Sequence, residues 1–442
     1  GSHYLVETGS ARILLDCGMY QGGRELRDRN WQPFPVPPQS IDAVVLSHAH
    51  IDHTGYLPRL IRDGFEKAVH ATAATRDLCD LLLPDSARLM EEEAEFRNRK
   101  GATRHDPALP LYTEAEAHEA VRRIVPVRDG RITTLPGGTL LTLHRAGHIL
   151  GSSLVELGPD GVTLLFTGDL GRRDPLLLRP PQTGLAADYV MVESTYGDRR
   201  HAERDPRPAL AELVRRVAAR SGVIVIPAFA VGRTQEVLFI LRELEDAGAI
   251  PRLPVAVDSP MATDVTALFG KYPSELEQDV RRFGDRALCP DGLRFTRSVE
   301  ESKALNAEEG PAIIISASGM ATGGRVLHHL KQRLPDPRNA VLLVGHQVEG
   351  TRGYSLLHGA KELRIFKQDV PVRAEIANVD AFSAHADTDE LLDWLRTLAH
   401  PPKHVFLIHG EDPARAALAT RIQADLGWQV SAPAYGERVE VT

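Results

Sequence analysis

Residues 48–53 read His-Ala-His-Ile-Asp-His, which places three histidines and an aspartate within six consecutive residues. The mostly apolar residues 41–46 predict a buried strand before this segment, and residues 55–62 predict the start of a helix after it. The polar side chains are therefore expected at the C-terminal end of a strand, where open α/β sheets bind ligands. Imidazole and carboxylate groups without a thiolate suit zinc, iron or manganese. We interpret the segment as a metal-binding turn, and the alternative is a solvated polar turn.

Length and composition predict a globular protein with more than one domain. The chain has 442 residues, which exceeds the size at which a single hydrophobic core usually stops growing. A hydrophobic content of 43% and a charged content of 25% give no indication of disorder. Apolar stretches such as residues 222–231 are too short to cross a bilayer, and no signal segment opens the chain. We expect a cytoplasmic protein without membrane contact, and leave open whether residues 1–3 are native.

The cysteines indicate neither a disulfide framework nor a Cys-rich zinc site. Cys17, Cys79 and Cys289 are far apart in the sequence and odd in number. We interpret all three as small buried hydrophobic residues.

The net charge of −8 argues against a general nucleic-acid coat protein, because neutralisation of phosphates by Lys and Arg dominates such binding. The charge is unevenly distributed, however. Residues 323–370 contain eight basic residues against four acidic ones. This segment is a candidate nucleic-acid footprint, and a solvated face with scattered charges explains the same count equally well.

Further ionisable residues follow predicted strands. Asp169, Glu193 and His409 come at or just after the ends of three such strands, and His148 is flanked by glycines that permit close backbone approach. The repetition indicates a shared crevice. Asp16 also ends a predicted strand; it either caps backbone groups or lies beneath the metal site and orients a ligand, and the sequence favours neither role.

The pattern of strands and helices predicts an α/β protein in which one domain interrupts another. Residues 196–371 contain a compact run of strands and helices, typical of an independent α/β domain. Strands that end in metal-type residues resume after this run. We therefore expect a site-bearing domain made of residues 1–195 and 372–442, with an inserted domain at residues 196–371.

Seven side chains are candidate metal ligands, which is too many for one tetrahedral ion. Two ions bridged by a carboxylate and a water can use all seven. The assignment is His48, His50 and His148 for one ion, Asp52, His53 and His409 for the other, and Asp169 as the bridge. Two Lewis acids would lower the pKa of the shared water and provide a hydroxide that attacks phosphorus or a carbonyl carbon.

The His-x-His-x-Asp-His signature resembles that of the metallo-β-lactamase superfamily, and the resemblance covers essentially the whole chain. Residues 193–197, 382–385 and 407–411 are similar to motifs A, B and C of the β-CASP nucleases. Further matches are Pro-Ala-Phe-Ala-Val-Gly-Arg at 227–233, Ser-Ala-Ser-Gly-Met at 316–320, and Gly-Thr-Arg-Gly at 350–353. The nearest relatives that these motifs imply are bacterial and archaeal homologues of the cleavage-and-polyadenylation specificity factor endonuclease.

This resemblance implies a metallo-β-lactamase αββα sandwich with an inserted α/β β-CASP domain, and a centre of two divalent ions, most typically Zn²⁺. It implies that Asp16 supports a metal ligand, and that His409 favours RNA over DNA as the substrate. The expected activity is hydrolysis of single-stranded RNA, by endonucleolytic cuts, in RNA processing or decay. The oligomeric state is left open, a homodimer included.

The resemblance also implies roles beside the metals. Asp169, Glu193 and His385 are the expected catalytic residues, with the carboxylate of Glu193 orienting His385 and the imidazole protonating or stabilising the departing oxygen. The hydroxyl of Ser383 would contact the scissile phosphate. Arg352, in the matching segment 350–353, and His385 are further candidates for binding substrate.

The sequence leaves other functions and sites open. A small-molecule hydrolase acting on a thioester or lactam could use the same centre, although the large insert suits a polymer better. An RNA-binding scaffold with a vestigial centre is disfavoured by the intact ligand set. His328 and His346 are either ordinary surface histidines or reach RNA, and residues 316–324 form either a phosphate site or a plain turn.

Overall fold

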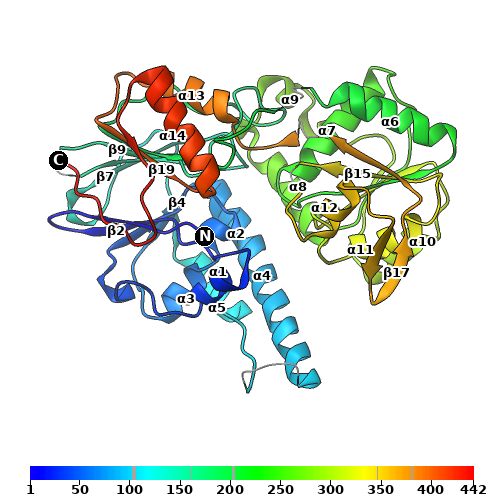
Figure 1. The fold of residues 1–442 in the computed structure, drawn as a ribbon, viewed down its shortest axis with the longest axis horizontal. Coiled ribbons are helices and arrows are strands. Elements are labelled where there is room, and N and C mark those ends of the chain that lie inside the picture. The colour runs from blue at the N-terminus through cyan, green and yellow to red at the C-terminus, as the bar shows by residue number, and fades with distance from the viewer. Residues whose placement is uncertain (102–105, 160, 202–204, 346, 380–381) are drawn as a thin grey trace. The chain divides into compact units, whose positions relative to one another are not determined.

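The computed structural model describes residues 1–101, 106–159, 161–201, 205–345, 347–379 and 382–442 (Figure 1). The chain forms two compact units. The first contains residues 1–200 and 385–442, and the second contains residues 201–384. Both chain ends thus belong to the first unit, which the second unit interrupts. None of the described helices combines the length and apolar composition that a bilayer crossing requires.

The first unit contains a five-stranded sheet with the order β1-β2-β3-β4-β5. Strands β1 and β2 are antiparallel, and the pairs from β2 to β5 are parallel. The strands are β1 (Tyr4–Glu7), β2 (Arg12–Leu15), β3 (Ala43–Val45), β4 (Val69–Ala71) and β5 (Ile124–Pro126).

A seven-stranded sheet with the order β20-β19-β10-β9-β8-β7-β6 completes this unit. Its half from β6 to β9 is antiparallel, and its half from β9 to β20 is parallel. The strands are β6 (Thr133–Thr134), β7 (Leu140–Arg145), β8 (Ser153–Gly158), β9 (Leu164–Phe166), β10 (Tyr189–Glu193), β19 (His404–Ile408) and β20 (Val430–Ser431).

The two sheets pack against each other through one apolar layer. Ile13 and Val45 of the five-stranded sheet meet Leu141, Leu157 and Phe166 of the seven-stranded sheet, and all five are fully buried. A second apolar layer joins the outer face of the seven-stranded sheet to α13 and α14. Helices α4 and α5 contact β5 of the other sheet. The unit is therefore the αββα sandwich that the motifs implied.

Two helices of this unit begin at side-chain caps. Thr72 accepts a hydrogen bond from the backbone of Thr75 at the start of α4. Thr113 and Glu116 form a capping box at the start of α5. The helices are α1 (Arg24–Arg29), α2 (Ile51–Thr54), α3 (Leu57–Arg62), α4 (Ala73–Lys100), α5 (Glu114–Arg122), α13 (Thr388–Arg396) and α14 (Asp412–Leu426).

The second unit is built on a six-stranded, fully parallel sheet with the order β13-β12-β14-β11-β15-β18. Its strands are apolar and mostly buried, as expected for a parallel sheet covered on both faces. The strands are β11 (Val223–Pro227), β12 (Val255–Val257), β13 (Leu293–Phe295), β14 (Ala312–Ser316), β15 (Ala340–Val344) and β18 (Glu375–Val379), and a separate hairpin is formed by β16 (Glu362–Ile365) and β17 (Gln368–Pro371).

Seven helices accompany this sheet among the residues described. They are α6 (Arg207–Ala219), α7 (Arg233–Asp246), α8 (Pro260–Lys271), α9 (Gln278–Arg282), α10 (Val299–Ala307), α11 (Val326–Arg333) and α12 (Arg352–Leu357). With its alternating strands and helices, the second unit is the expected α/β insert.

Three details differ from the sequence predictions. The predicted return to the first domain at residue 372 comes too early, because β18 pairs in parallel with β15 and so belongs to the second unit. The first division also lies at residue 200 rather than 195. Cys17 and Cys79 are buried as predicted, but Cys289 is exposed.

Candidate metal centre

The metal-binding segment lies between β3 and α2. Helix α2 begins at Ile51, directly after His50, and is a separate short helix that the sequence did not predict, whereas the helix expected at residues 55–62 is α3. Asp52 and His53 therefore lie on its only turn, while His48 and His50 belong to the loop before it. His48 and His53 are fully buried. The change from strand to helix turns the four side chains of one short segment toward a common point.

Three histidines and one carboxylate form a first group of ligand atoms. Nδ1 of His50 lies 3.1 Å from Nε2 of His48 and 3.2 Å from Nε2 of His148. Oδ2 of Asp169 lies 3.5 Å from Nε2 of both His48 and His148. Zinc–nitrogen bonds of about 2.0–2.1 Å in a tetrahedron separate neighbouring ligand atoms by about 3.3 Å. The first group has this spacing.

A second group lies on the other side of Asp169. Nε2 of His409 lies 3.1 Å from Nε2 of His53 and 3.2 Å from Oδ2 of Asp52. Oδ1 of Asp169 lies 3.3 Å from Nε2 of His53. Each oxygen of Asp169 thus faces a different group, which is the arrangement of a bridging carboxylate.

The electrostatics of these side chains fit a divalent cation. Oδ1 of Asp169 is buried and has no hydrogen-bond partner among the described residues. Burial raises the pKa of Asp169, but the charges of surrounding histidines, with His409 and His53 foremost, outweigh it and hold the pKa well below its usual value. Burial lowers the pKa of His50 to about 4. The pKa values of His53 and His409 are raised instead, because the negative charges of Asp169 and Asp52 outweigh their burial, so in the absence of a cation these two imidazoles balance the carboxylates. A divalent cation would take over this balance of charge, since metal binding releases protons from its ligands.

Asp16 connects this cluster to the strand beneath it. It follows β2, has a φ of 56°, and is fully buried. Its Oδ1 accepts the backbone N–H of Ser47 at 2.7 Å, and its Oδ2 accepts the Ser47 hydroxyl at 2.8 Å. Oδ2 also lies 2.6 Å from Nδ1 of His53. Asp16 therefore fills both roles that the sequence left open: it caps the loop, and it turns Nε2 of His53 toward the second group.

His385 and Glu193 form a pair next to the cluster. Nδ1 of His385 lies 3.1 Å from Oε2 of Glu193, and its Nε2 lies 3.9 Å from Oδ2 of Asp169. Glu193 is fully buried and also accepts the backbone N–H of Leu170 at 2.5 Å. Burial lowers the pKa of His385, but Glu193 and Asp169 outweigh it and raise the pKa to about 9. The raised pKa favours the protonated form of His385.

Neighbouring strands explain why residues far apart in the sequence meet here. Glu193 is level with Ile408 in the parallel pair of β10 and β19, so His409 follows at the same edge. Asp169 lies just beyond β9, which pairs with the other side of β10. Carboxyl ends of parallel strands share one edge of a sheet. The strand-end residues therefore meet at this edge of the sheet.

Two residues of the site were missed by the sequence reasoning. The hydroxyl of Ser47 lies 3.0 Å from Nδ1 of His48, and the hydroxyl of Thr195 lies 3.2 Å from Nδ1 of His409. Ser47 contacts the nitrogen of His48 opposite the one that faces the ligand group, whereas Nδ1 of His409 also lies 3.4 Å from Oδ1 of Asp169. Two sequence signals could have indicated them: Ser47 directly precedes a ligand histidine, and Thr195 lies within the segment similar to motif A.

Two predicted substrate-binding residues, Ser383 and Arg352, lie in the second unit. Ser383 is buried in the second unit, and its contact with phosphate stays a prediction. Arg352 also belongs to the second unit, where it donates to the carbonyl of Arg364 at 2.9 Å and to that of Thr322 at 3.0 Å. It thus ties α12 to the hairpin and to the loop before α11. His346 lies outside the described residues.

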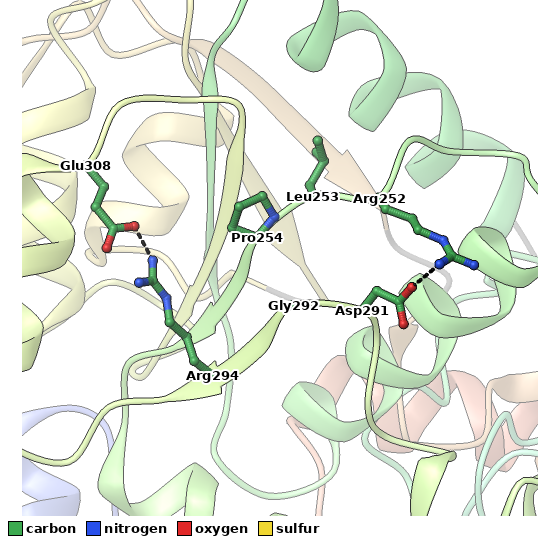
Figure 2. A pocket seen from close by; sticks show the side chains of 7 residues that line it. All are labelled: Arg252, Leu253, Pro254, Asp291, Gly292, Arg294 and Glu308. Atoms are coloured by element: carbon green, nitrogen blue, oxygen red, sulfur yellow. Dashed lines mark hydrogen bonds and ion pairs between the residues drawn. The ribbon is translucent and has the colours of Figure 1, made fainter.

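The second unit also contains an open pocket of about 480 Å³ (Figure 2). It lies at the N-terminal ends of β12 and β13, opposite to the edge where parallel sheets bind ligands. Its charged side chains pair with one another: Arg252 with Asp291 at 2.5 Å, and Arg294 with Glu308. The pocket therefore offers no uncompensated charge, and the metal centre is the stronger functional site.

Comparison with known proteins adds three family matches. Residues 1–210 match the metallo-beta-lactamase superfamily, residues 234–356 match the Beta-Casp domain, and residues 369–433 match the Zn-dependent metallo-hydrolase RNA specificity domain. One solved structure, a protein of unknown function from Enterococcus faecalis, matches with a TM-score of 0.56 at 14% identity over 99% of this chain and 96% of that one. That likeness shows the fold alone.

Curated relatives include both bacterial and archaeal proteins. The chain is 38% identical to Ribonuclease TTHA0252 of Thermus thermophilus, over 100% of this chain and 97% of the relative. It is 32% identical to Transcription termination factor FttA of Methanocaldococcus jannaschii, over 92% of this chain and 64% of the relative. The factor of the same name from Methanothermobacter thermautotrophicus is 31% identical over 99% and 69%. The chain thus spans about two thirds of these archaeal proteins.

Proposed function

The chain belongs to the β-CASP branch of the metallo-β-lactamase superfamily and is a metal-dependent ribonuclease, and we propose that it cuts single-stranded RNA at internal phosphodiester bonds. The family that the motifs implied is confirmed, and the small-molecule alternative is not favoured. An RNA substrate fits the cytoplasmic location that we expect.

Two zinc ions are the proposed metal content. The two ligand groups share Asp169 through different oxygens, which supports two ions rather than one. His48, His50 and His148 would hold the first ion, and Asp52, His53 and His409 the second. Two divalent ions in this place supply Lewis acidity, which lowers the pKa of a water and offsets the charge of a phosphodiester. The protein contributes the orientation of each ligand, through Asp16 in the case of His53.

The single observation that carries the proposal is the pair of His385 and Glu193 beside the cluster, in which Nδ1 of His385 lies 3.1 Å from Oε2 of Glu193 and Nε2 lies 3.9 Å from Oδ2 of Asp169. Cleavage of a phosphodiester expels a ribose oxygen, which is a strong base and leaves readily only when it receives a proton. A thiolate leaving from a thioester is a far weaker base and needs no such donor. The geometry therefore suits a phosphodiester: Nε2 of His385 faces Asp169 and the proposed metals, and would deliver the proton.

Ser383 is proposed to donate its hydroxyl hydrogen bond to the scissile phosphate. It stands two residues before His385 in the chain. The distance between this hydroxyl and a phosphate oxygen would be set by the substrate.

The test is cleavage of an RNA labelled at many internal positions, with both product ends mapped, for the wild type and Asp169→Asn. Metal content is measured on the same samples by mass spectrometry. We expect internal cuts and two zinc ions per wild-type chain, and loss of cleavage with lowered metal content in the variant. Release of mononucleotides from one end would overturn the endonucleolytic mode. RNA binding without cleavage by the zinc-loaded wild type would overturn the enzymatic function.

A further inference from the structure

The hairpin of β16 and β17 has an unusual turn. Ile365 pairs with Gln368, so the turn consists of Phe366 and Lys367 alone. Their φ angles are 49° and 64°, the left-handed conformation that a two-residue type I′ turn requires at both positions. Glycine, asparagine and aspartate normally occupy such positions, and a bulky aromatic residue there is an outlier. The hairpin thus carries a phenylalanine where a glycine would fold with less strain, and backbone strain of this kind often marks a functional position.

The side chain of Phe366 does not contribute to a core. It is 46% exposed. Its ring packs on that of His328, on the exposed side of α11, with centroids 4.6 Å apart and planes inclined by 37°. Figure 1 shows β17 beside α11 within the second unit. Phe366 and His328 together form an exposed ring pair, called here the aromatic platform.

Positive charge surrounds the aromatic platform. Lys367 adjoins Phe366 in the turn, Lys331 lies one helical turn after His328 on α11, and Lys303 lies on α10. Partial burial is the largest cause that lowers the pKa of His328, the charges of His329, Lys331 and Lys303 lower it further, and the carboxylate of Asp258 raises it. Within the described residues, none of the three lysines forms an ion pair with a carboxylate. Arg364 of the same hairpin differs, because Asp369 neutralises it at 2.7 Å.

We propose that the aromatic platform is an RNA-binding site, which stacks on an unpaired base while Lys303, Lys331 and Lys367 contact the flanking phosphates. Proteins that bind single strands combine aromatic rings on which bases stack with a positively charged surface that follows the backbone. An acidic peptide would use the lysines but gain nothing from a strained, exposed phenylalanine. The choice of RNA as the ligand rests on the proposed function. The inference adds an RNA-binding site in the second unit.

The experiment measures binding of a fluorescein-labelled 12-nucleotide single-stranded RNA to the full chain by fluorescence anisotropy. All proteins carry Asp169→Asn so that the RNA stays intact. Phe366→Ala should weaken binding about fivefold or more, the effect of losing one base stack. Phe366→Trp keeps a ring and should bind within about twofold of the parent, because stacking tolerates any aromatic surface. Val299→Ala on α10 trims another exposed apolar side chain and serves as the matched control.

Two further variants test other aspects of the proposal. One distinguishes a loss of RNA binding from a loss of folding stability, and the other tests for a phosphate contact. Phe366→Gly relieves the left-handed strain, so it should keep or raise the melting temperature while it weakens RNA binding as Phe366→Ala does. Lys367→Ala should lower the slope of log affinity against log salt by about 0.7, the value for one phosphate contact on a single strand. An unchanged slope, or equal affinity of Phe366→Ala and its parent, overturns the proposal.

The partner class is tested in the same assay. Labelled poly-glutamate should bind weakly and without dependence on Phe366; equal dependence would identify an acidic peptide as the ligand and overturn an RNA site. Cleavage of RNA by the chain with Asp169 intact is measured separately. Absence of cleavage defeats the proposed function, whereas cleavage together with unaltered binding by Phe366→Ala defeats only the aromatic platform.

Discussion

Oδ2 of Asp16 lies 2.6 Å from Nδ1 of His53, and both side chains are buried. The carboxylate follows β2 and the imidazole stands on α2, so the contact joins the five-stranded sheet to the proposed metal centre. Asp16 also accepts two hydrogen bonds from Ser47, which fix the orientation of its carboxylate. The carboxylate in turn orients the imidazole of His53. Metal affinity should depend on a residue that binds no metal.

Asp16→Asn is expected to weaken metal binding about 10–100-fold, since loss of a carboxylate that orients a ligand histidine has this effect. Competition with a fluorescent zinc chelator measures the change. Asp42→Asn is the control: Asp42 accepts the backbone N–H of Arg12 at 2.8 Å and lies at the other end of the same strands. Similar zinc affinities for the two variants would contradict the role of Asp16.

His385→Ala is expected to keep the metals and to lose RNA cleavage about 10²–10⁴-fold, the usual contribution of a positioned proton donor. Hydrolysis of bis(p-nitrophenyl) phosphate should fall much less, because p-nitrophenolate leaves without a proton. Loss of zinc from His385→Ala would instead make this residue a ligand. Equal losses on both substrates would show that it does not act on the leaving group.

The pH dependence of RNA cleavage should reveal the same proton. The pKa of His385 is raised to about 9, so its active, protonated form is present at lower pH and is lost as the pH rises through that value. We expect kcat/KM of the wild type to fall above pH 9. The residual activity of His385→Ala should lack this alkaline limb, and persistence of the limb would assign it to another group.

Asp258 is expected to stabilise the second unit. It is fully buried and accepts hydrogen bonds from Ser302 at 2.6 Å and from Arg325 at 2.8 Å, with Nε2 of His329 at 2.7 Å. Asp258→Ala should cost about 3–5 kcal/mol, because it leaves buried donors and charge without a partner. Urea unfolding followed by fluorescence measures the loss.

The matched control is Asp279→Ala, whose carboxylate is exposed and pairs with Arg282 on the surface. The pH adds a second check. Burial raises the pKa of Asp258, but its hydrogen bonds outweigh burial and hold the pKa below the ordinary value. A depressed pKa means that the stabilisation is present above about pH 4 and is lost as the pH falls further. A difference between wild type and Asp258→Ala that grows on acidification would contradict this assignment.

Much of this protein was predictable because the relevant signals are local. The ligand types of His48, His50, Asp52 and His53 follow from their order in one short segment. Hydrophobic periodicity likewise predicted most strands of both units. Family motifs added the roles of Glu193 and His385, which no periodicity contains.

The tertiary structure decided the rest, because pairing between distant strands leaves no local trace. Only the parallel alignment of β9, β10 and β19 brings Asp169, Glu193 and His409 to one edge. Only the pairing of β18 with β15 assigns that strand to the second unit. The left-handed turn at Phe366 and its ring contact with His328 likewise depend on how a hairpin meets a helix. Composition and spacing thus determined which chemistry the chain can perform, and hydrogen bonding between strands determined where its groups meet.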